Sequence, residues 1–304
     1  MSADRRVAAE PLVPRYTRRH LLAIGGALGA GIVLAACGGD TPVAVEDTEV
    51  PIDPEGLVVA QRYPQSKALT PGEVRLAISL ASTDGALVTQ GPDVLRGIIR
   101  DAEGTQVATF ETPHRGEGLG VPYWSITATL PTAGLYDFSF DGAAGDPTPF
   151  ILFDPAETTV PSPTQVLAPF DTPTTDDARG VDPICTRLDG PCPFHEVTLT
   201  DALAAGKPVV YLVGTPAHCA TATCGPGLDF LIEVAKAYDG VATFVHAEVF
   251  ADPEGTKVAP AVTATGLDYE PVILVTDASG TIVRRIDIVW DQAELTELLA
   301  DALS

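Results

Sequence analysis

The chain has 304 residues, of which 45% are hydrophobic, and this length and composition are enough for two domains with cores of their own. Its 18 basic and 41 acidic residues give a formal net charge of -23 at pH 7. This charge excludes a protein that binds nucleic acid through a basic surface, and it indicates a well-solvated acidic surface instead.

The first 36 residues have the composition of an export signal. Arg18 and Arg19 precede an uncharged apolar run from Leu21 to Ala36 that is too short and too rich in Gly and Ala for a typical membrane span. A basic region, an apolar core and small residues before a boundary are typical of a secretory signal. The paired arginines resemble the twin-arginine signal, and the Leu-Ala-Ala-Cys sequence that ends at Cys37 resembles the lipobox of bacterial lipoproteins.

This resemblance implies that residues 1–36 are a twin-arginine-type lipoprotein signal peptide and that Cys37 becomes a lipid-modified N-terminus. We therefore expect a lipid-anchored protein on the extracytoplasmic face of the cell membrane, where disulfides persist. An uncleaved membrane anchor is the alternative, and it would leave the rest of the chain on the same side.

Two kinds of segment follow the signal. Residues 37–65 are polar and interrupted by prolines, and we predict a disordered tether. Residues 66–155 contain short alternating runs separated by turn residues, which predicts an antiparallel β-sandwich. Residues 130–136, which end in Tyr136, resemble the tyrosine corner of immunoglobulin-like domains, in which the hydroxyl holds the chain before a core strand. The resemblance implies an immunoglobulin-like domain, and the sequence leaves its role open.

The second half of the chain has a different pattern. Residues 156–180 are rich in proline and threonine, and we predict a second linker that carries no core. Residues 181–304 alternate strands and helices, as an α/β domain does. The expected elements are a short helix at 201–205 capped by Thr200, strands at 209–213, 242–249, 271–276 and 281–289, and helices that open near 225, 260 and 291.

Four cysteines remain besides Cys37, an even number for an oxidising compartment. Pairing of sequence neighbours favours the disulfides Cys185–Cys192 and Cys219–Cys224, with the first as a structural staple at the entry to the domain. A zinc site built from all four cysteines is disfavoured, because neither pair has C-x2-C spacing.

Cys219 and Cys224 stand between a buried strand and an amphipathic helix. The free N–H groups and the dipole at a helix N-terminus stabilise a thiolate, so this layout favours a reactive cysteine. Lys207-Pro208, the strand and the cysteine-containing turn together resemble the active-site segment of the thioredoxin superfamily. The order of elements over residues 181–304 is similar to the thioredoxin fold of TlpA-like proteins.

The resemblance implies a thiol–disulfide oxidoreductase that acts on exported proteins or exchanges with a redox partner, without a cofactor. Cys219 would attack, Cys224 would resolve, and Pro271 would be the cis-proline that shapes the substrate groove. A protonated His218 would favour the thiolate of Cys219, whereas a charged Glu270 would oppose it.

The sequence also departs from the thioredoxin pattern and leaves two alternatives open. The spacing is C-x4-C in place of C-x2-C, and strand 209–213 lacks the buried acid of many thioredoxins. The main alternative is a non-catalytic thioredoxin-like binding or scaffold lipoprotein with two structural disulfides. A Sco-type copper-delivery protein is the weaker one, since His246 lies within a strand, His195 is expected in a loop, and no metal site is predicted.

Overall fold

The structure is a computed structural model that describes residues 54–304. The predicted signal peptide with Arg18 and Arg19, the lipidation site Cys37 and most of the predicted tether lie outside the described residues. Within the part that is described, no helix combines the length and the apolar character needed to cross a membrane.

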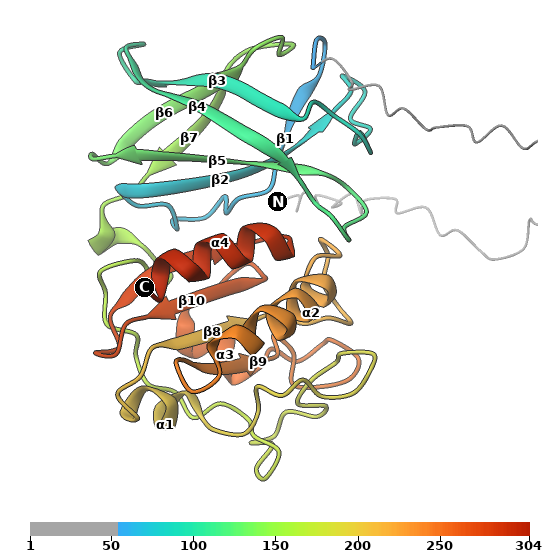
Figure 1. Ribbon diagram of the computed structural model, residues 1–304, viewed down its shortest axis with the longest axis vertical. Coiled ribbons are helices and arrows are strands. Elements are labelled where there is room, and N and C mark those ends of the chain that lie inside the picture. Colours follow the sequence, from blue (N-terminus) through green and yellow to red (C-terminus); the bar gives the residue numbers. More distant parts are fainter. Residues whose placement is uncertain (1–53) are drawn as a thin grey trace, which may run out of the picture. The chain divides into compact units, whose positions relative to one another are not determined.

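The first part of the described chain is an antiparallel β-structure (Figure 1). Its seven strands are β1 (Val58–Gln61), β2 (Gly72–Ala81), β3 (Val94–Asp101), β4 (Gln106–Arg115), β5 (Tyr123–Leu130), β6 (Gly134–Phe140) and β7 (Thr148–Leu152). They are hydrogen-bonded in the order β1-β2-β5-β4-β3-β6-β7. Strand β4 pairs with β3 over most of its length but with β5 only at His114 and Arg115. It therefore joins two halves of the sheet, one made of β1, β2 and β5 and the other of β3, β6 and β7.

One apolar core lies between these halves and receives side chains from β2 to β7. Alternation along the strands supplies them, because every second residue of a strand points to the same face. Trp124 is fully buried there, and its indole N–H donates to the carbonyl oxygen of Pro92 at 3.1 Å. The hydroxyl of Tyr136 donates to the carbonyl oxygen of Thr132 at 3.0 Å, which is the hydrogen bond expected of the segment 130–136.

The second part contains a four-stranded mixed sheet. Its strands are β8 (Val209–Val213), β9 (Thr243–Ala247), β10 (Val272–Thr276) and β11 (Ile282–Asp287), in the order β11-β10-β8-β9. Strands β8 and β9 are parallel, whereas β10 is antiparallel to both β8 and β11. Every residue of the central strands β8 and β10 is buried, which explains their continuous apolar sequences.

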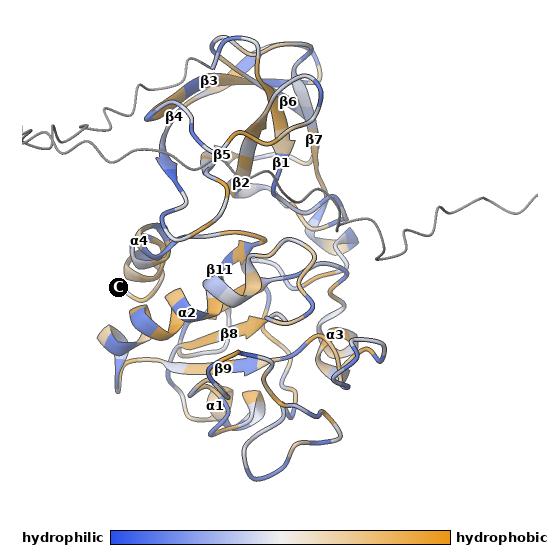
Figure 2. Cartoon of the chain, turned by 90° about the vertical axis from the view of Figure 1, so that its right-hand side faces the viewer, coloured by the Kyte–Doolittle hydropathy of each residue, from blue (hydrophilic) through white to orange (hydrophobic). Residues whose placement is uncertain are grey.

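Helices cover both faces of this sheet, and the hydropathy colouring shows apolar residues along the buried strands (Figure 2). The helices are α1 (Leu199–Ala204), α2 (Cys224–Ala235), α3 (Pro260–Thr265) and α4 (Gln292–Ala302), with short 3₁₀ turns η1 (Pro155–Glu157) and η2 (Lys236–Tyr238). Helices α2 and α4 share a core with Val210 and Leu212 of β8, whereas α1 and α3 share one with Val209, Tyr211 and Val213.

Three of the helix ends, at the start of α1 and α4 and at the end of α3, follow capping rules. The Asp291 side chain is the N-cap of α4 and accepts a hydrogen bond from the backbone N–H of Glu294 at 2.8 Å. Helix α3 ends at Gly266, which has φ of 65°, a left-handed conformation that glycine adopts readily. Helix α1 begins two residues earlier than predicted, because Thr198 rather than Thr200 is its N-cap and accepts from the N–H of Asp201.

The predicted linker at 156–180 does contribute to a core, contrary to the prediction. Val160 and Leu167 are buried among the residues that cover one face of the mixed sheet. The side-chain oxygen of Thr172 accepts a hydrogen bond from the N–H of Leu199 at the start of α1. Proline and threonine predict an extended backbone, but an extended segment can lie against a sheet as readily as in solvent. For the same reason, Val58–Gln61 forms strand β1 inside the predicted tether 37–65.

A buried ion pair joins β2 to α4. Arg75 donates to both carboxylate oxygens of Glu294, with N–O distances of 2.9 Å and 2.7 Å, and the Tyr123 hydroxyl donates to the same carboxylate at 2.6 Å. The two charged side chains are 10% and 4% exposed. Burial alone would raise the pKa of Glu294, but the Arg75 guanidinium more than offsets this effect and holds the pKa at about 2.

The substitution Glu294→Gln should lower the free energy of unfolding at neutral pH by about 3–5 kcal/mol, because it leaves Arg75 buried without a counter-charge. The folded-state pKa of about 2 lies below the ordinary value of 4.5. The carboxylate's contribution is therefore present above pH 4.5 and is lost as the pH falls toward 2, and the difference between wild type and variant should shrink in that window. Urea denaturation across the pH range measures both effects.

Glu297→Gln is the matched control, since Glu297 on the same helix is 64% exposed and pairs with Arg115 at the surface. Its loss should change stability by no more than about 0.5 kcal/mol. Equal unfolding midpoints for the Glu294 and Glu297 variants would contradict the account of the buried ion pair.

Candidate redox site and adjacent cysteine–histidine cluster

Cys219 and Cys224 form a disulfide, as pairing of sequence neighbours predicted. Cys224 is the first residue of α2 and is 2% exposed, while Cys219 lies in the preceding turn and is only partly buried. A sulfur of another protein can therefore reach Cys219 more readily than Cys224.

The environment of Cys219 suits a thiolate. The backbone N–H of Cys224, at the first turn of α2, donates to Cys219 Sγ at 3.2 Å. The hydroxyl of Thr221 lies 3.1 Å from the same sulfur. Because an N–H at a helix N-terminus stabilises negative charge, reduction of the disulfide would leave Cys219 as the better nucleophile of the two.

Glu270 is a partly buried acid close to the disulfide, in the segment that precedes β10. Its Oε2 accepts a hydrogen bond from the N–H of Thr215 at 2.7 Å and lies 3.6 Å from Cys224 Sγ. Burial raises the pKa of Glu270 to about 7. A charged Glu270 was expected to oppose the thiolate, but at neutral pH the residue is partly protonated and can exchange a proton with the Cys224 thiol.

The peptide bond between Glu270 and Pro271 is cis, which is the isomer that the family resemblance implies. Pro271 lies against the end of β8 at Gly214. A Cβ atom at Gly214 would stand 3.1 Å from Pro271 Cβ and 3.9 Å from Cys224 Cβ. A side chain at position 214 would crowd Pro271, because 3.1 Å is tighter than most contacts that a Cβ atom makes.

His218 does not make the contact with Cys219 that the sequence suggested. Its Nε2 donates to the carbonyl oxygen of Pro253 at 3.0 Å, and its ring packs edge-on against Phe250. The contacts of its imidazole are thus with residues 250–253, rather than with the sulfur of Cys219.

A mainly apolar pocket of about 220 Å³ opens beside Glu270. Glu270 is the residue that this pocket shares with the surroundings of the disulfide, and neither cysteine lines it. Its lining residues are Val213, Val249, Phe250, Val258, Val262, Leu267, Asp268, Tyr269 and Glu270.

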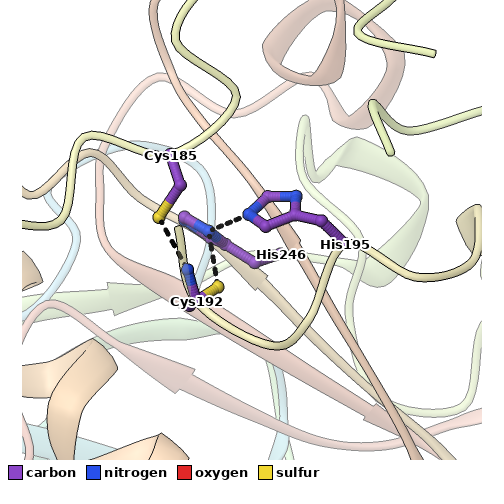
Figure 3. A group of neighbouring side chains, drawn as sticks. All are labelled: Cys185, Cys192, His195 and His246. Carbon is purple, nitrogen blue, oxygen red and sulfur yellow. Dashed lines mark hydrogen bonds between the residues drawn. The ribbon is translucent and has the colours of Figure 1, made fainter. Parts of the chain in front are cut away.

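The predicted disulfide between Cys185 and Cys192 is not present. Both residues are buried free cysteines, and the N–H of Cys192 donates to Cys185 Sγ at 3.4 Å. His195 and His246 complete a group of four in which all the ligand atoms lie within 4.8 Å of one another (Figure 3). Spacing alone favoured a bridge between the two cysteines, because the sequence does not show that β9 brings His246 to them.

The two histidines are buried more completely than the sequence suggested. His195 lies in a loop as expected but is 1% exposed, and His246 in β9 is 0% exposed. His246 Nδ1 lies 3.4 Å from Cys192 Sγ and 3.1 Å from His195 Nε2. The C-x2-H spacing of Cys192 and His195 could have indicated that these two side chains lie together. Nothing near His246 in the sequence connects this residue to the group.

No protein-family model matches the chain, and no curated protein matches it in sequence. Among solved structures, the chain is similar to a thioredoxin-family thiol:disulfide interchange protein from Chlorobium tepidum TLS, with 18% identity and a TM-score of 0.34 over 47% of this chain and 98% of that one. It is also similar to the PKD domain of the human VPS10 domain-containing receptor SorCS2, with 16% identity and a TM-score of 0.18 over 40% of this chain and 97% of that one.

A third similar structure is the ZirS C-terminal domain, with 12% identity and a TM-score of 0.19 over 48% of this chain and 94% of that one. All three TM-scores are below 0.5, so none of these likenesses by itself establishes a shared fold. At a coarse level, the chain is rich in antiparallel strands, carries a disulfide at the start of a helix and has a thioredoxin-family protein among its structural neighbours.

Proposed function

We propose that the protein is a thiol–disulfide oxidoreductase whose C-terminal part has a thioredoxin-like fold. The observation that carries the proposal is the partly exposed Cys219, bonded to the buried Cys224 at the start of α2 and flanked by Glu270 and cis-Pro271. The mixed sheet with helices on both faces supports the fold. The antiparallel strands before it, with the hydrogen bond of Tyr136, support an immunoglobulin-like assignment for the first domain.

The exchange reaction uses both cysteines in turn. In the reducing direction, the Cys219 thiolate attacks one sulfur of a substrate disulfide, a bond forms to Cys219 Sγ, and the other substrate sulfur leaves as a thiolate that is protonated by solvent. The Cys224 thiol then gives its proton to Glu270 and attacks Cys219 Sγ. The first substrate sulfur leaves as a thiolate, and two electrons have passed from the dithiol to the substrate.

Glu270 is the proton acceptor in the second step, and the same steps in reverse would oxidise a substrate dithiol. A pKa of about 7 lies near the pH of operation, where a general acid or base is most effective. The distance of 3.6 Å to Cys224 Sγ is within reach of a hydrogen bond to sulfur.

The substrate class is an exported polypeptide. The pocket beside Glu270 is mainly apolar and would hold a hydrophobic side chain next to the reacting cysteine of the substrate. Backbone groups next to cis-Pro271 would bind the extended substrate chain, as the family resemblance implies.

Cys219→Ser should reduce the exchange rate at least ~100-fold, because it removes the nucleophile. Cys224→Ser should keep the first step and accumulate a mixed disulfide between Cys219 and the substrate. Reduction of a small disulfide peptide gives the rate, and mass spectrometry before and after addition of reductant identifies the adduct. Glu233→Gln, an exposed change on the same helix, is the control and should leave the rate unchanged.

The reduction potential of the Cys219–Cys224 pair gives an independent measurement. We expect a value between about -120 and -270 mV, the range of dedicated exchange proteins, whereas structural bridges usually lie below about -300 mV. A value in the lower range, together with an unchanged exchange rate in Cys219→Ser, would favour the non-catalytic binding or scaffold alternative.

Glu270→Gln should slow the attack of Cys224 about 100-fold at neutral pH, because the proton acceptor is lost. In the wild type, the rate of this step should rise with pH as Glu270 loses its proton around pH 7, and the variant should lack this rise. Stopped-flow measurement of the attack of Cys224 on the mixed disulfide, across the pH range, tests this prediction. Glu254→Gln, an exposed change, is the control and should keep the wild-type pH profile. A Glu270→Gln variant that also keeps this profile would rule out the role of Glu270.

We further propose that the protein is exported and anchored by a lipid on Cys37, which the Arg18-Arg19 pair and the lipobox-like sequence support. The wild type should sediment with membranes. In intact cells, it should be labelled by a protein-modifying reagent that does not cross the cell membrane. Cys37→Ser should abolish incorporation of labelled fatty acid, and replacement of Arg18 and Arg19 by Lys should leave the protein inside the cell. Fatty-acid label retained by Cys37→Ser would refute the lipidation site.

A further inference from the structure

We propose that Cys185, Cys192, His195 and His246 bind one Zn²⁺ ion through two sulfur and two nitrogen atoms. The four side chains converge from two loop segments and strand β9 (Figure 3). This inference does not depend on the exchange activity of the other two cysteines.

The distances between the ligand atoms fit a tetrahedral site. Zinc binds sulfur at about 2.3 Å and nitrogen at about 2.0–2.1 Å, so neighbouring ligand atoms of a tetrahedron lie roughly 3.3–3.8 Å apart. His246 Nδ1 is 3.4 Å from Cys192 Sγ and 3.1 Å from His195 Nε2. All four ligand atoms are within 4.8 Å of one another, so small side-chain adjustments bring them around one ion.

The hydrogen bonds of the histidines orient their lone pairs toward this point. His246 Nε2 donates to the carbonyl oxygen of Gly214 at 2.9 Å, and His195 Nδ1 lies 3.5 Å from the carbonyl oxygen of Pro173. A neutral imidazole has one N–H, so protons on these outer nitrogens leave both inner nitrogens with lone pairs. Without an ion, a proton on one inner nitrogen can join the two rings in a hydrogen bond at 3.1 Å, and a bound cation would replace that proton between the two lone pairs. Outer hydrogen bonds of this kind are usual for histidines that bind zinc.

Charge and burial support the same ion. The four residues are between 0% and 5% exposed. Two thiolates, two neutral imidazoles and Zn²⁺ sum to zero, so the complete site places no net charge in the interior. A set of two sulfur and two nitrogen ligands in tetrahedral arrangement selects zinc over magnesium or calcium, and four protein ligands with no open position are typical of a structural site.

Zinc at this position would fix the segment around Cys185, which contacts the turn that carries Cys219. Thr186, next to Cys185, accepts a hydrogen bond on its side-chain oxygen from the N–H of Ala217 at 3.1 Å. Its own N–H and hydroxyl donate to Glu248 at 2.5 Å and 3.0 Å. The carbonyl group that holds His246 belongs to Gly214, whose Cα faces Pro271. The metal would therefore stabilise the surroundings of Cys219 without taking part in exchange.

The test uses the full chain in detergent under reducing conditions, with Co²⁺ as the spectroscopic probe. After removal of bound metal by a chelator, one equivalent of Co²⁺ should give the intense thiolate-to-cobalt absorption and the visible bands of a tetrahedral complex. Zn²⁺ should displace it at one ion per chain, and elemental analysis of the untreated protein should find one zinc per chain. Cys192→Ser and His246→Gln should each weaken zinc binding at least ~100-fold.

The double variant Cys219→Ser, Cys224→Ser is the control and should keep the cobalt spectrum and the zinc, which separates this site from the redox pair. His114→Gln, a change in the first domain, controls for the general loss of a histidine. If a variant in the cluster fails to fold, the cobalt spectrum of the wild type still decides the question. Weak, octahedral cobalt absorption, a Cys185–Cys192 disulfide in the purified protein, or bound copper in place of zinc would each overturn the proposal.

Discussion

The backbone of Gly214 is the point at which the surroundings of both cysteine pairs meet. On one side, Pro271 packs so closely that a Cβ atom at Gly214 would stand 3.1 Å from the proline Cβ, and Cys224 Cβ would be in ordinary contact with that atom at 3.9 Å. On the other side, the carbonyl oxygen of Gly214 accepts the hydrogen bond of His246. Its N–H donates to Ala247, which continues the pairing of β8 with β9 beyond the last strand residue. One backbone unit thus packs against the cis-proline and the disulfide and also accepts a hydrogen bond from a histidine of the neighbouring cluster.

Much of the C-terminal fold could be predicted from the sequence. Strand Val209–Val213 and helix Pro260–Thr265 have the bounds that their apolar runs and their Pro and Gly boundaries indicate, since these signals are local. The cap at Asp291 was equally readable. Composition was less informative for residues 156–180, because the burial of Val160 and Leu167 depends on a sheet formed by residues far along the chain.

The candidate site was predictable only in part, for the same reason. Cys219, Cys224 and Pro271 belong to segments that carry their own signals, and the structure brings them together. Glu270 could be located, but its charge depends on burial, which raises its pKa to about 7 and leaves it partly uncharged at neutral pH. His246 lies 51 positions from His195, and only the register of β9 against β8 places it beside the loop cysteines.

The proline-rich segment before residue 181 has a practical consequence for dissecting the protein. Besides Val160 and Leu167, the core on this face of the mixed sheet includes Ala68, whose carbonyl oxygen accepts a hydrogen bond from Arg285. A fragment cut at the apparent boundary near residue 181 would leave part of that face uncovered and would be prone to aggregation. The smallest piece that keeps this core intact therefore begins before residue 68, so the two halves of the chain are best produced together.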